Sequence, residues 1–493
     1  MKMCASLFNL PAHPAKHRRG SILSPGAWII LVLALISGIV ILSRPGQYTN
    51  HDLEFWVFAD THFAMYTDLL NNDWNPNHRP IDGKPNSGLR VLAIHLSTTP
   101  EQQRMLSGFY SQTPIADLLE IERSKIGAAF AMPINEIGLY DLTDKLKEKG
   151  KDGLSLMDKI NAPSFSPWTT RGHIFGLPHD IHPVMLIYRA DIVEAAGIDV
   201  KQIETWDDYV RLLSPLMVEK DADGTPKHYL LNLYTDGVDQ VEMLLLQNNG
   251  RYFDENGAPD INTPQNAHTI SQIVLWCTGE TVDKGGTRIA YKAPEFNNGA
   301  DNDRVSGKVL ASLAPDWLSG VYQHNIPLLE GKVKLMPMPA WQKGGRHTSI
   351  WGGTMLGISK RTHDFDKAWT FATELYTSPK IAEKLYREAG IVSPVKAMWD
   401  SPIYAEPVPY FSNQPRGKLY LSLAGEVPLR TSSPFHERAR SLLSNAVLHL
   451  ETYAKEKHIT TIEPLEAEAK KMLDDLNKEL QKMIDNDLFE IPK

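Results

Sequence analysis

The sequence of 493 residues is poor in cysteine and contains only Cys4 and Cys277. A disulfide framework, or a zinc site built from cysteines, needs more of them, so both are excluded. Apolar and charged residues are not scarce: 42 % of the residues are hydrophobic and 22 % are charged, as in ordinary globular proteins. This composition excludes a disordered or collagen-like chain, and the length suggests roughly three domains or two large ones.

The sequence also lacks the common catalytic spacings. It contains no G-x-S-x-G, H-E-x-x-H, G-x-x-x-x-G-K-[ST] or G-x-G-x-x-G segment. These segments mark serine hydrolases, zinc proteases, nucleotide-binding loops and dinucleotide-binding folds, so none of these classes is indicated. We therefore expect no catalytic residue and no cofactor, and we do not expect an enzyme.

Two segments carry residues that could still suggest chemistry. His179 and His182, with Asp180 between them, have no third metal ligand at an informative spacing, and the prolines beside them indicate a loop. A polar hinge or pocket role is favoured there, and no metal is expected. Glu120 and Glu122 share one face of a predicted strand. Hydrogen bonding at the strand end is favoured over a catalytic acid pair, which would need both carboxylates to reach a cleft.

Basic residues are outnumbered by acidic ones. Lys and Arg total 51 and Asp and Glu total 59, which gives a formal net charge of −8. The first 45 residues hold five basic residues and no acidic one, which leaves −13 on the remaining 448. A body this acidic argues against a nucleic-acid partner, because binding the phosphate backbone requires clustered cations. A non-ionic or cationic small ligand fits the charge better.

One long hydrophobic run is present near the start of the chain. Residues 27–42 read AWIILVLALISGIVIL, with basic residues before the run and Arg44 after it. Sixteen helical residues cover about 24 Å, slightly less than the roughly 30 Å hydrocarbon core of a bilayer. The alternative is a cleaved signal peptide, but the run begins late and no small-x-small cleavage site follows it. We therefore predict a cytoplasmic segment at 1–26 and a transmembrane signal anchor at 27–43, with the rest exported.

The exported part alternates apolar runs with helical patterns. Apolar runs at 53–60, 89–96 and 115–122 are each followed by residues with helical spacing. This order is typical of a mostly parallel sheet covered by helices. Residues 184–188 then read as a buried strand after a proline-rich crossing, and residues 462–483 predict an amphipathic helix docked on the body.

Polar and aromatic residues stand where several apolar runs end. In open α/β sheets the ligand crevice lies at the carboxyl ends of the strands. Carboxylates there can accept hydrogen bonds from hydroxyl groups, and aromatic faces can stack on the apolar face of a sugar ring. A Trp or Tyr in such a position can equally be a core or hinge packing residue. The candidate ligand-binding residues are Asp60, His62, Glu122, Ser124, Tyr234, Asp316, Trp317 and Trp351.

Several segments also carry a family resemblance. In order, they read GLPHDIHPVMLIYRADIVEAAGI, TWDDYVRLL, SLAPDWLSGVY, KVKLMPMPAWQKGGRHTSIWGGTMLGISK and AWTFATELYTSPKIAEKLYREAGIVSPV. The chain resembles the bacterial extracellular solute-binding proteins of ABC importers (family 1) over roughly residues 51–450. The nearest branch is the sugar-binding one that includes maltodextrin-binding proteins. The hydrophobic anchor, the loop at 71–88 and the tail after residue 450 depart from the family pattern.

The resemblance implies an α/β fold, namely the two-lobed periplasmic-binding-protein type II architecture with hinge crossings, here preceded by one N-terminal transmembrane helix. The implied parts are lobe one at 51–165 and 328–372, lobe two at 166–327 and 373–450, and a C-terminal helical tail at 451–493. A sugar or oligosaccharide would be held between the lobes by hinge closure and passed to the membrane permease of an ABC importer. The expected location is the cell membrane, single-pass, with the main body on the extracytoplasmic side.

Two other functions stay open. An anchored glycan-processing enzyme would need two carboxylates at catalytic separation around a cleft, and turnover assays with Glu120 and Glu122 substituted would test it. A ligand-sensing scaffold subunit would keep the two-lobed fold but pass the ligand state through the anchor or the tail helix. Deletion of residues 462–493 followed by an uptake assay would test that second function.

Overall fold

The computed structural model describes residues 24–43, 51–72, 89–111, 113–430 and 433–486. The chain divides into two compact units, residues 1–50 and residues 51–493. The loop predicted at 71–88 begins too early, because Asn71 and Asn72 belong to the helix α2 (Asp60–Asn72). Residues 73–88 and most of the predicted cytoplasmic segment 1–26 lie outside the described residues.

The first unit contains one described helix, α1 (Pro25–Ser43), whose side chains from Trp28 to Ser37 are exposed. Within the described residues, no helix is found that combines the length and the apolar character needed to cross a membrane. The membrane anchor at 27–43 therefore stays a prediction.

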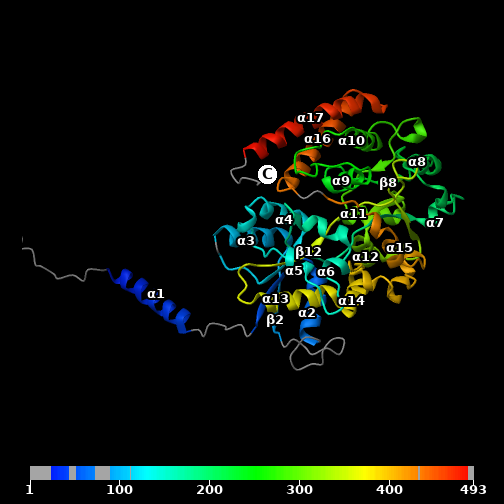
Figure 1. Ribbon diagram of the computed structural model, residues 1–493. Coiled ribbons are helices and arrows are strands. Elements are labelled where there is room, and N and C mark those ends of the chain that lie inside the picture. The colour runs from blue at the N-terminus through cyan, green and yellow to red at the C-terminus, as the bar shows by residue number, and fades with distance from the viewer. Residues whose placement is uncertain (1–23, 44–50, 73–88, 112, 431–432, 487–493) are drawn as a thin grey trace, which may run out of the picture. The chain divides into compact units, whose positions relative to one another are not determined.

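The second unit contains two five-stranded sheets (Figure 1). The strands of the first sheet are β1 (Leu53–Val57), β2 (Val91–His95), β3 (Leu118–Glu122), β6 (Leu177–Pro178) and β12 (Thr354–Ile358). They lie in the order β2–β1–β3–β12–β6. β1 is parallel to both of its neighbours, and β12 is antiparallel to both of its own.

Helices pack on both faces of the first sheet. They are α2 (Asp60–Asn72), α3 (Thr98–Ser111), α4 (Arg123–Phe130) and α13 (Phe365–Thr377). Phe55 of β1 packs with Tyr66 of α2 and Phe371 of α13, at ring-centroid distances of 5.6 and 5.7 Å. The next residue, Trp56, belongs to a separate apolar cluster that includes Met105 of α3. Because successive side chains of a strand point to opposite faces, a strand buried on both faces reads as a continuous apolar run.

The second sheet consists of β7 (Val184–Arg189), β8 (Leu231–Asn232), β9 (Ala290–Tyr291), β10 (Ala311–Pro315) and β11 (Val333–Pro337). The order is β11–β7–β10–β8–β9, with β7 antiparallel to both neighbours and β8 parallel to both of its own. All six residues of β7 are buried, which confirms the buried strand predicted at 184–188.

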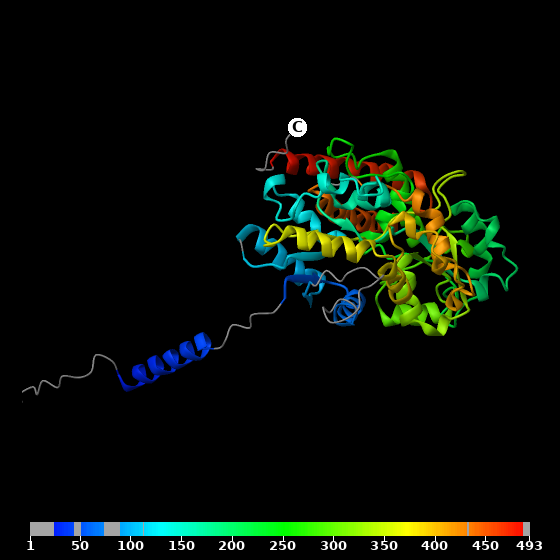
Figure 2. The same ribbon diagram turned by 60° about the horizontal axis from the view of Figure 1, so that its bottom comes forward.

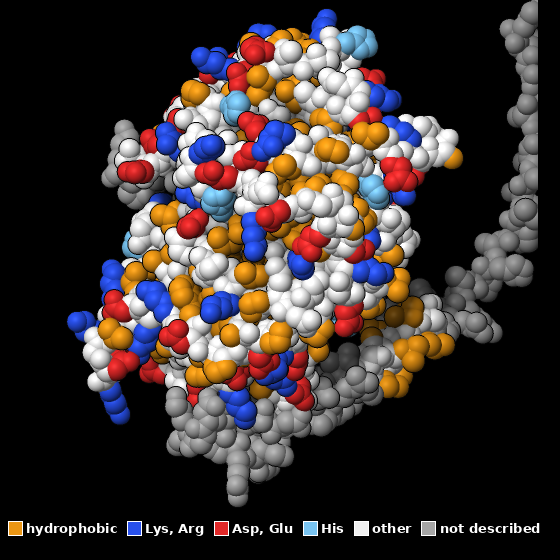
Figure 3. All heavy atoms as spheres, turned by 90° about the vertical axis from the view of Figure 1, so that its right-hand side faces the viewer, with side chains coloured by type: hydrophobic (Ala, Val, Ile, Leu, Met, Phe, Trp, Pro, Cys, Tyr) orange, Lys and Arg blue, Asp and Glu red, His pale blue; other side chains and the backbone are white. Residues whose placement is uncertain are grey.

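Further helices surround the second sheet or follow it. They are α7 (Ala190–Val193), α8 (Trp206–Leu213), α9 (Val238–Gln247), α10 (Pro264–Cys277), α11 (Asn298–Ser306), α12 (Asp316–Asn325), α14 (Pro379–Ala389), α15 (Arg416–Leu423), α16 (His436–Glu456) and α17 (Ile462–Asp485). Shorter elements are β4 (Thr169–Thr170), β5 (His173–Ile174), α5 (Thr143–Lys147) and α6 (Leu156–Lys159). On the face drawn in Figure 3, acidic and basic side chains are interspersed, and no large basic patch forms there.

Each sheet with its helices forms one lobe, so the two-lobed α/β fold and the predicted β-α-β-α-β-α order are confirmed. Two strands lie across the predicted lobe boundaries. β11 falls in the segment assigned to lobe one but pairs with β7 of the second sheet. β6 falls in the segment assigned to lobe two but pairs with β12 of the first sheet. The crossings therefore begin later in the chain than the family resemblance implied, and the remaining boundaries stay predictions.

Two crossings, which run beside each other, join the lobes. The first crossing (residues 179–183) links β6 to β7, and the second crossing (residues 338–353) links β11 to β12. Pro183 and Ile350 form an antiparallel bridge, and the amide of Val184 donates to the carbonyl of Ser349 at 3.2 Å. The two crossings are thus hydrogen-bonded to each other at the junction of the lobes.

The C-terminal helices belong to the body. α17 packs along α10 and α16, and both views show it beside α16 at the outer side of lobe two (Figures 1 and 2). Its buried residues are Leu465, Ala469, Leu473, Leu476 and Leu480. This confirms a docked amphipathic helix. α16 reaches farther, because it contacts α9 and α10 of lobe two and also α4 of lobe one.

Candidate functional site at the junction of the lobes

An aromatic group lies where β10 and the second crossing meet. The rings of Trp317 and Trp351 are 5.5 Å apart at 68°, and the Trp317 indole Nε1 donates to the Trp351 carbonyl at 3.3 Å. Phe296 stacks on Trp317 at 6.2 Å and is 67 % exposed. Gly352 has a φ of +85°, and a Cβ there would lie 2.8 Å from the Trp317 Nε1, so only glycine fits between the two tryptophans. The group therefore combines a fixed pair of rings with an accessible aromatic face.

Glu122 and Ser124 lie at the start of α4, close to this aromatic group. The Glu122 carboxylate caps the helix and accepts from the Ser124 amide at 2.9 Å and from the Ser124 hydroxyl. The amide of Arg123 donates to the carbonyl of Gly353 at 2.9 Å. The predicted residues of β3 and those of the second crossing are thus brought together, within two residues of Trp351.

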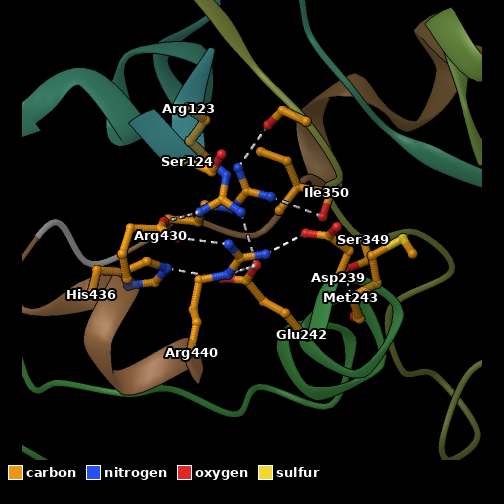
Figure 4. Close-up of polar contacts among 12 residues, drawn as sticks. Arg123, Ser124, Asp239, Glu242, Met243, Ser349, Ile350, Arg430, His436 and Arg440 are labelled. Carbon is orange, nitrogen blue, oxygen red and sulfur yellow. Dashed lines mark hydrogen bonds and ion pairs between the residues drawn. The ribbon is translucent and has the colours of Figure 1, made fainter. Parts of the chain in front are cut away.

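Charged side chains from both lobes meet beside α4 (Figure 4). We call this group the cross-lobe ion cluster; it consists of Arg123, Asp239, Glu242, Arg430, His436, Glu437 and Arg440. Arg123 of lobe one reaches Glu242 of α9 at 3.0 Å between Nη2 and Oε2. Arg440 of α16 contacts the same Oε2 through its Nε at 3.0 Å. One carboxylate of lobe two therefore holds a cation from lobe one and a cation from α16.

The cluster is largely shielded from water. The side chains of Arg123, Glu242 and Arg440 are 5 %, 1 % and 6 % exposed. Burial alone would raise the pKa of the Glu242 carboxyl, but Arg123 and Arg440 hold it well below its ordinary value, so Glu242 is ionised. Removing one member would leave the others charged and buried, which is strongly destabilising.

Arg430 is the cation of the cluster whose charge is least compensated by nearby carboxylates. Its guanidinium donates to the carbonyls of Ile350 and Gly352 at 3.1 and 2.8 Å, so it ties the segment before α16 to the second crossing. Burial, together with the nearby charge of Arg123, lowers the pKa of Arg430 to about 9. Burial also lowers the pKa of His436, which contacts Glu242 at 3.0 Å.

A second polar group runs through the first crossing. We call it the hinge network; it consists of His62, Tyr66, Glu120, His179, Asp180, His182, Asp316 and Tyr376. The Glu120 carboxylate accepts from the hydroxyls of Tyr66 and Tyr376 at 3.0 and 2.9 Å and contacts His62 Nδ1 at 3.1 Å. The Tyr66 oxygen lies 3.1 Å from His179 Nε2.

The network continues into lobe two through the first crossing. His179 Nδ1 lies 3.3 Å from the Asp180 carboxylate, which also contacts His182. His182 Nδ1 is 3.4 Å from Asp316 at the start of α12, and Asp316 accepts from the Val392 amide at 2.8 Å. Burial would lower the pKa of His182, but Asp180 and Asp316 raise it to about 9. His182 is therefore a buried cation between two carboxylates, in agreement with the predicted polar hinge.

The eight predicted site residues fall into different surroundings. Trp317 and Trp351 meet, with Glu122 and Ser124 nearby, whereas His62 and Asp316 are buried in the hinge network. Asp60 starts α2; its side chain is 92 % exposed and its carboxylate contacts His95 at 3.2 Å. Tyr234 follows β8, is half-buried, and its amide donates to the Gln240 side chain at 2.6 Å. A ligand role for each of the eight stays a prediction.

Sequence reasoning missed the ion cluster and Phe296. Phe296 follows β9, which is only two residues long, so no apolar run pointed to its strand end. Glu242 offered a signal, because it is the single acidic residue in VEMLLLQ, the mostly apolar second part of α9. A carboxylate on such a helix is buried and needs a cationic partner.

The comparisons with known proteins agree with this geometry. Residues 129–381 match the family model described as bacterial extracellular solute-binding protein. The chain belongs to this family. Membership agrees with the predicted extracytoplasmic body and with a binding protein in place of an enzyme.

Two curated relatives of this solute-binding protein are described as arabinooligosaccharide-binding proteins. The one from Halalkalibacterium halodurans is 25 % identical over 358 residues, which cover 72 % of this chain and 74 % of the relative. The one from Bacillus subtilis is 23 % identical over 374 residues, which cover 76 % of this chain and 79 % of the relative.

Solved structures show the same fold. The sugar-binding protein MalE of Xanthomonas citri matches with a TM-score of 0.67 at 14 % identity, covering 88 % of this chain and 99 % of that one. A binding protein associated with an ABC transporter of B. animalis subsp. lactis, in complex with β-1,6-galactobiose, matches with a TM-score of 0.63 at 18 % identity, again over 88 % and 99 %.

Proposed function

We propose that this solute-binding protein captures an oligosaccharide between its two lobes and delivers it to the permease of an ABC importer. The observation that carries the proposal is the aromatic group of Trp317, Trp351 and Phe296 at the lobe junction. An exposed ring next to a fixed pair of indoles suits the apolar face of a sugar. Glu122 and Ser124 close by offer hydrogen-bond partners for hydroxyl groups.

The names of the relatives support a carbohydrate ligand. Both curated relatives are described as binding arabinooligosaccharides, and two of the matching structures are described as sugar-binding or sugar-bound. An arabinooligosaccharide is therefore the first candidate ligand for this chain. Hinge closure would be driven by ligand contacts to both lobes, and the shift toward the closed form cannot exceed the ligand's differential affinity for that form.

The carboxylates of β3 do not favour an anchored enzyme. Glu120 accepts two tyrosine hydroxyls inside the hinge network, and Glu122 caps α4. Two free carboxylates facing one cleft are what glycoside hydrolysis requires. A binding role therefore accounts better for both residues.

We further propose that α1 holds the protein at the membrane. The large apolar side chains of α1 that are exposed are Trp28, Ile29, Ile30, Leu31, Val32, Leu33, Leu35 and Ile36. A helix that exposes apolar side chains all round needs an apolar environment. Fractionation of cells into membrane and soluble parts, for the full chain and a variant with Leu31→Asp and Leu35→Asp, tests this: the full chain should sediment with membranes and the variant should not.

The binding proposal is tested by titrating the detergent-solubilised full chain with arabinooligosaccharides and maltooligosaccharides in a calorimeter. We expect Phe296→Ala to weaken binding by about tenfold or more, because an exposed aromatic ring that stacks on the sugar contributes roughly 1 kcal/mol beyond its buried area. Tyr110→Ala, at an exposed aromatic residue of α3, is the matched control and should leave binding unchanged. Absence of binding to every sugar tried, with an intact fold, would remove the carbohydrate proposal.

A further inference from the structure

Three potential metal ligands converge at the lobe-one end of the hinge network. His62, Glu120 and His179 each offer one ligand atom, and these atoms all lie within 4.8 Å of one another. They come from α2, from β3 and from the first crossing, so 58 and 59 residues separate neighbours in the sequence. All three side chains are buried, with 4 %, 0 % and 4 % exposure.

The spacing and chemistry of the group fit a divalent transition metal. Two ligand atoms on one tetrahedral Zn²⁺ lie about 3.3 Å apart, because Zn–N and Zn–O bonds are close to 2.0–2.2 Å. His62 Nδ1 and Glu120 Oε2 are 3.1 Å apart, and the ligand atom of His179 lies within 4.8 Å of both ligand atoms. Two imidazoles and one carboxylate are a ligand set that Zn²⁺ binds, with one position left for water.

The surroundings of His179 provide an independent observation. Metal-bound histidines usually give their other ring N–H to a carboxylate, which fixes the ring and its tautomer. The Asp180 carboxylate lies 3.3 Å from His179 Nδ1, on the opposite side of the ring from the Nε2 that faces the group. His179 is therefore oriented as a ligand that binds through Nε2.

The charge of the group also favours a cation. Glu120 is fully buried, and within the described residues no Lys or Arg side chain forms an ion pair with it. A buried carboxylate needs a compensating charge, and here the available groups are imidazoles and tyrosine hydroxyls.

We propose that His62, Glu120 and His179 bind one divalent transition-metal ion, with Zn²⁺ as the best match. The ion would replace the hydrogen bond between His179 Nε2 and the Tyr66 hydroxyl. It would fasten the first crossing to α2 and β3 and so stiffen the lobe-one end of the hinge. This departs from the sequence-based expectation of no metal, because His62 and Glu120 are distant in the chain from His179. The site does not touch the aromatic group, so it is independent of the proposed solute binding.

The test measures metal content in the full chain, produced with a Strep tag and dialysed against metal-free buffer after loading with Zn²⁺. We expect about one zinc per chain by plasma mass spectrometry and a higher melting temperature than in the chelator-treated protein. His179→Gln should abolish the retained zinc. Asp180→Asn should weaken zinc binding by about 10–100-fold while leaving the ligands in place.

A matched control and a second measurement keep the outcome decisive. His173→Gln changes an exposed histidine that pairs with Asp141 at 2.6 Å, and it should retain the zinc. If His179→Gln fails to fold, the test is the addition of Co²⁺ to the unmodified chain. Tetrahedral Co²⁺ absorbs strongly in the visible range, and this absorption should disappear when Zn²⁺ displaces the Co²⁺. Less than about 0.1 zinc per chain together with no cobalt spectrum, or full zinc retention in folded His179→Gln, would overturn the proposal.

Discussion

The cross-lobe ion cluster and the hinge network both connect the lobes, but they do so in different ways. The hinge network follows the first crossing, so its contacts lie along a covalent connection. The ion cluster joins α4 of lobe one to α9 and α16 through side chains alone. Contacts at a hinge can persist while the lobes move, whereas contacts across the opening must break when the lobes separate. We therefore expect the contacts of the ion cluster to change with the proposed closure and those of the hinge network to persist through it.

The largest effect is expected from Glu242→Ala. This change leaves Arg123, Arg440 and His436 without their shared acceptor, and breaking a buried ion pair from one side costs about 3–5 kcal/mol. We expect a loss of that size in the free energy of unfolding of the full chain, measured by urea denaturation. Glu280→Ala, which removes an exposed partner of Lys284, should change it by less than about 0.5 kcal/mol.

A smaller and more selective effect is expected from Arg123→Met. Glu242 keeps Arg440 and His436, so each lobe should stay folded, but the contact between Glu242 and lobe one is lost. We expect solute affinity to fall by about tenfold and small-angle scattering to show a more open solute-free protein. Tyr376→Phe is the comparison in the hinge network: it removes one hydrogen bond to Glu120 and should lower stability without changing affinity. Equal loss of affinity in both variants would contradict the division of roles.

The smallest effects concern the change of stability with pH. This change has opposite signs at His182 of the hinge network and at His436 of the ion cluster. The pKa of His182 is raised to about 9 in the folded protein, so its stabilising contribution is complete below pH 6.5 and disappears as the pH rises to 9. Burial lowers the pKa of His436, so the wild-type protein loses stability as the pH falls below 6.5. For each histidine, the free energy of unfolding changes by at most about 1.4 kcal/mol per pH unit.

Melting curves of His182→Gln and His436→Gln between pH 5 and pH 9 check these signs. His182→Gln should be most destabilised, relative to the wild type, at the acidic end of the range. His436→Gln should lose less stability than the wild type on going from pH 7 to pH 5. Parallel curves for the two variants would show that neither histidine titrates as its surroundings indicate.

Much of the fold was predictable because its signals are local. The apolar runs of β1, β2 and β3, the capping spacing at Thr205 and the amphipathic pattern of α17 each depend on neighbouring residues. The capping box is present, with the Thr205 amide 3.1 Å from the Asp208 carboxylate. Two-residue strands such as β6 and β9 leave no such pattern, and they are where the lobe boundaries and Phe296 were missed.

The site was predictable only in part because its residues meet across long sequence distances. The rule of polar residues after strands led to Trp317 and Trp351 and also to Asp60, which is an exposed helix start. The same rule could not separate His62 and Asp316, which are buried in the hinge, from residues that face solute. Arg123 and Glu242 are 119 residues apart, and only the packing of α16 against α4 and α9 brings Arg440 to both.

The position of α16 in the chain has a consequence for how the protein is made. Arg430, His436 and Arg440 come after the strands of both sheets in the chain, so they leave the ribosome later than those strands. Both sheets are complete before these residues arrive, since the last strand, β12, ends at Ile358. N-terminal parts of a chain generally fold first during synthesis. The cross-lobe ion cluster therefore forms only after both sheets have been made, and a chain cut short before α16 would lack Arg440 and the contact of α16 with α4.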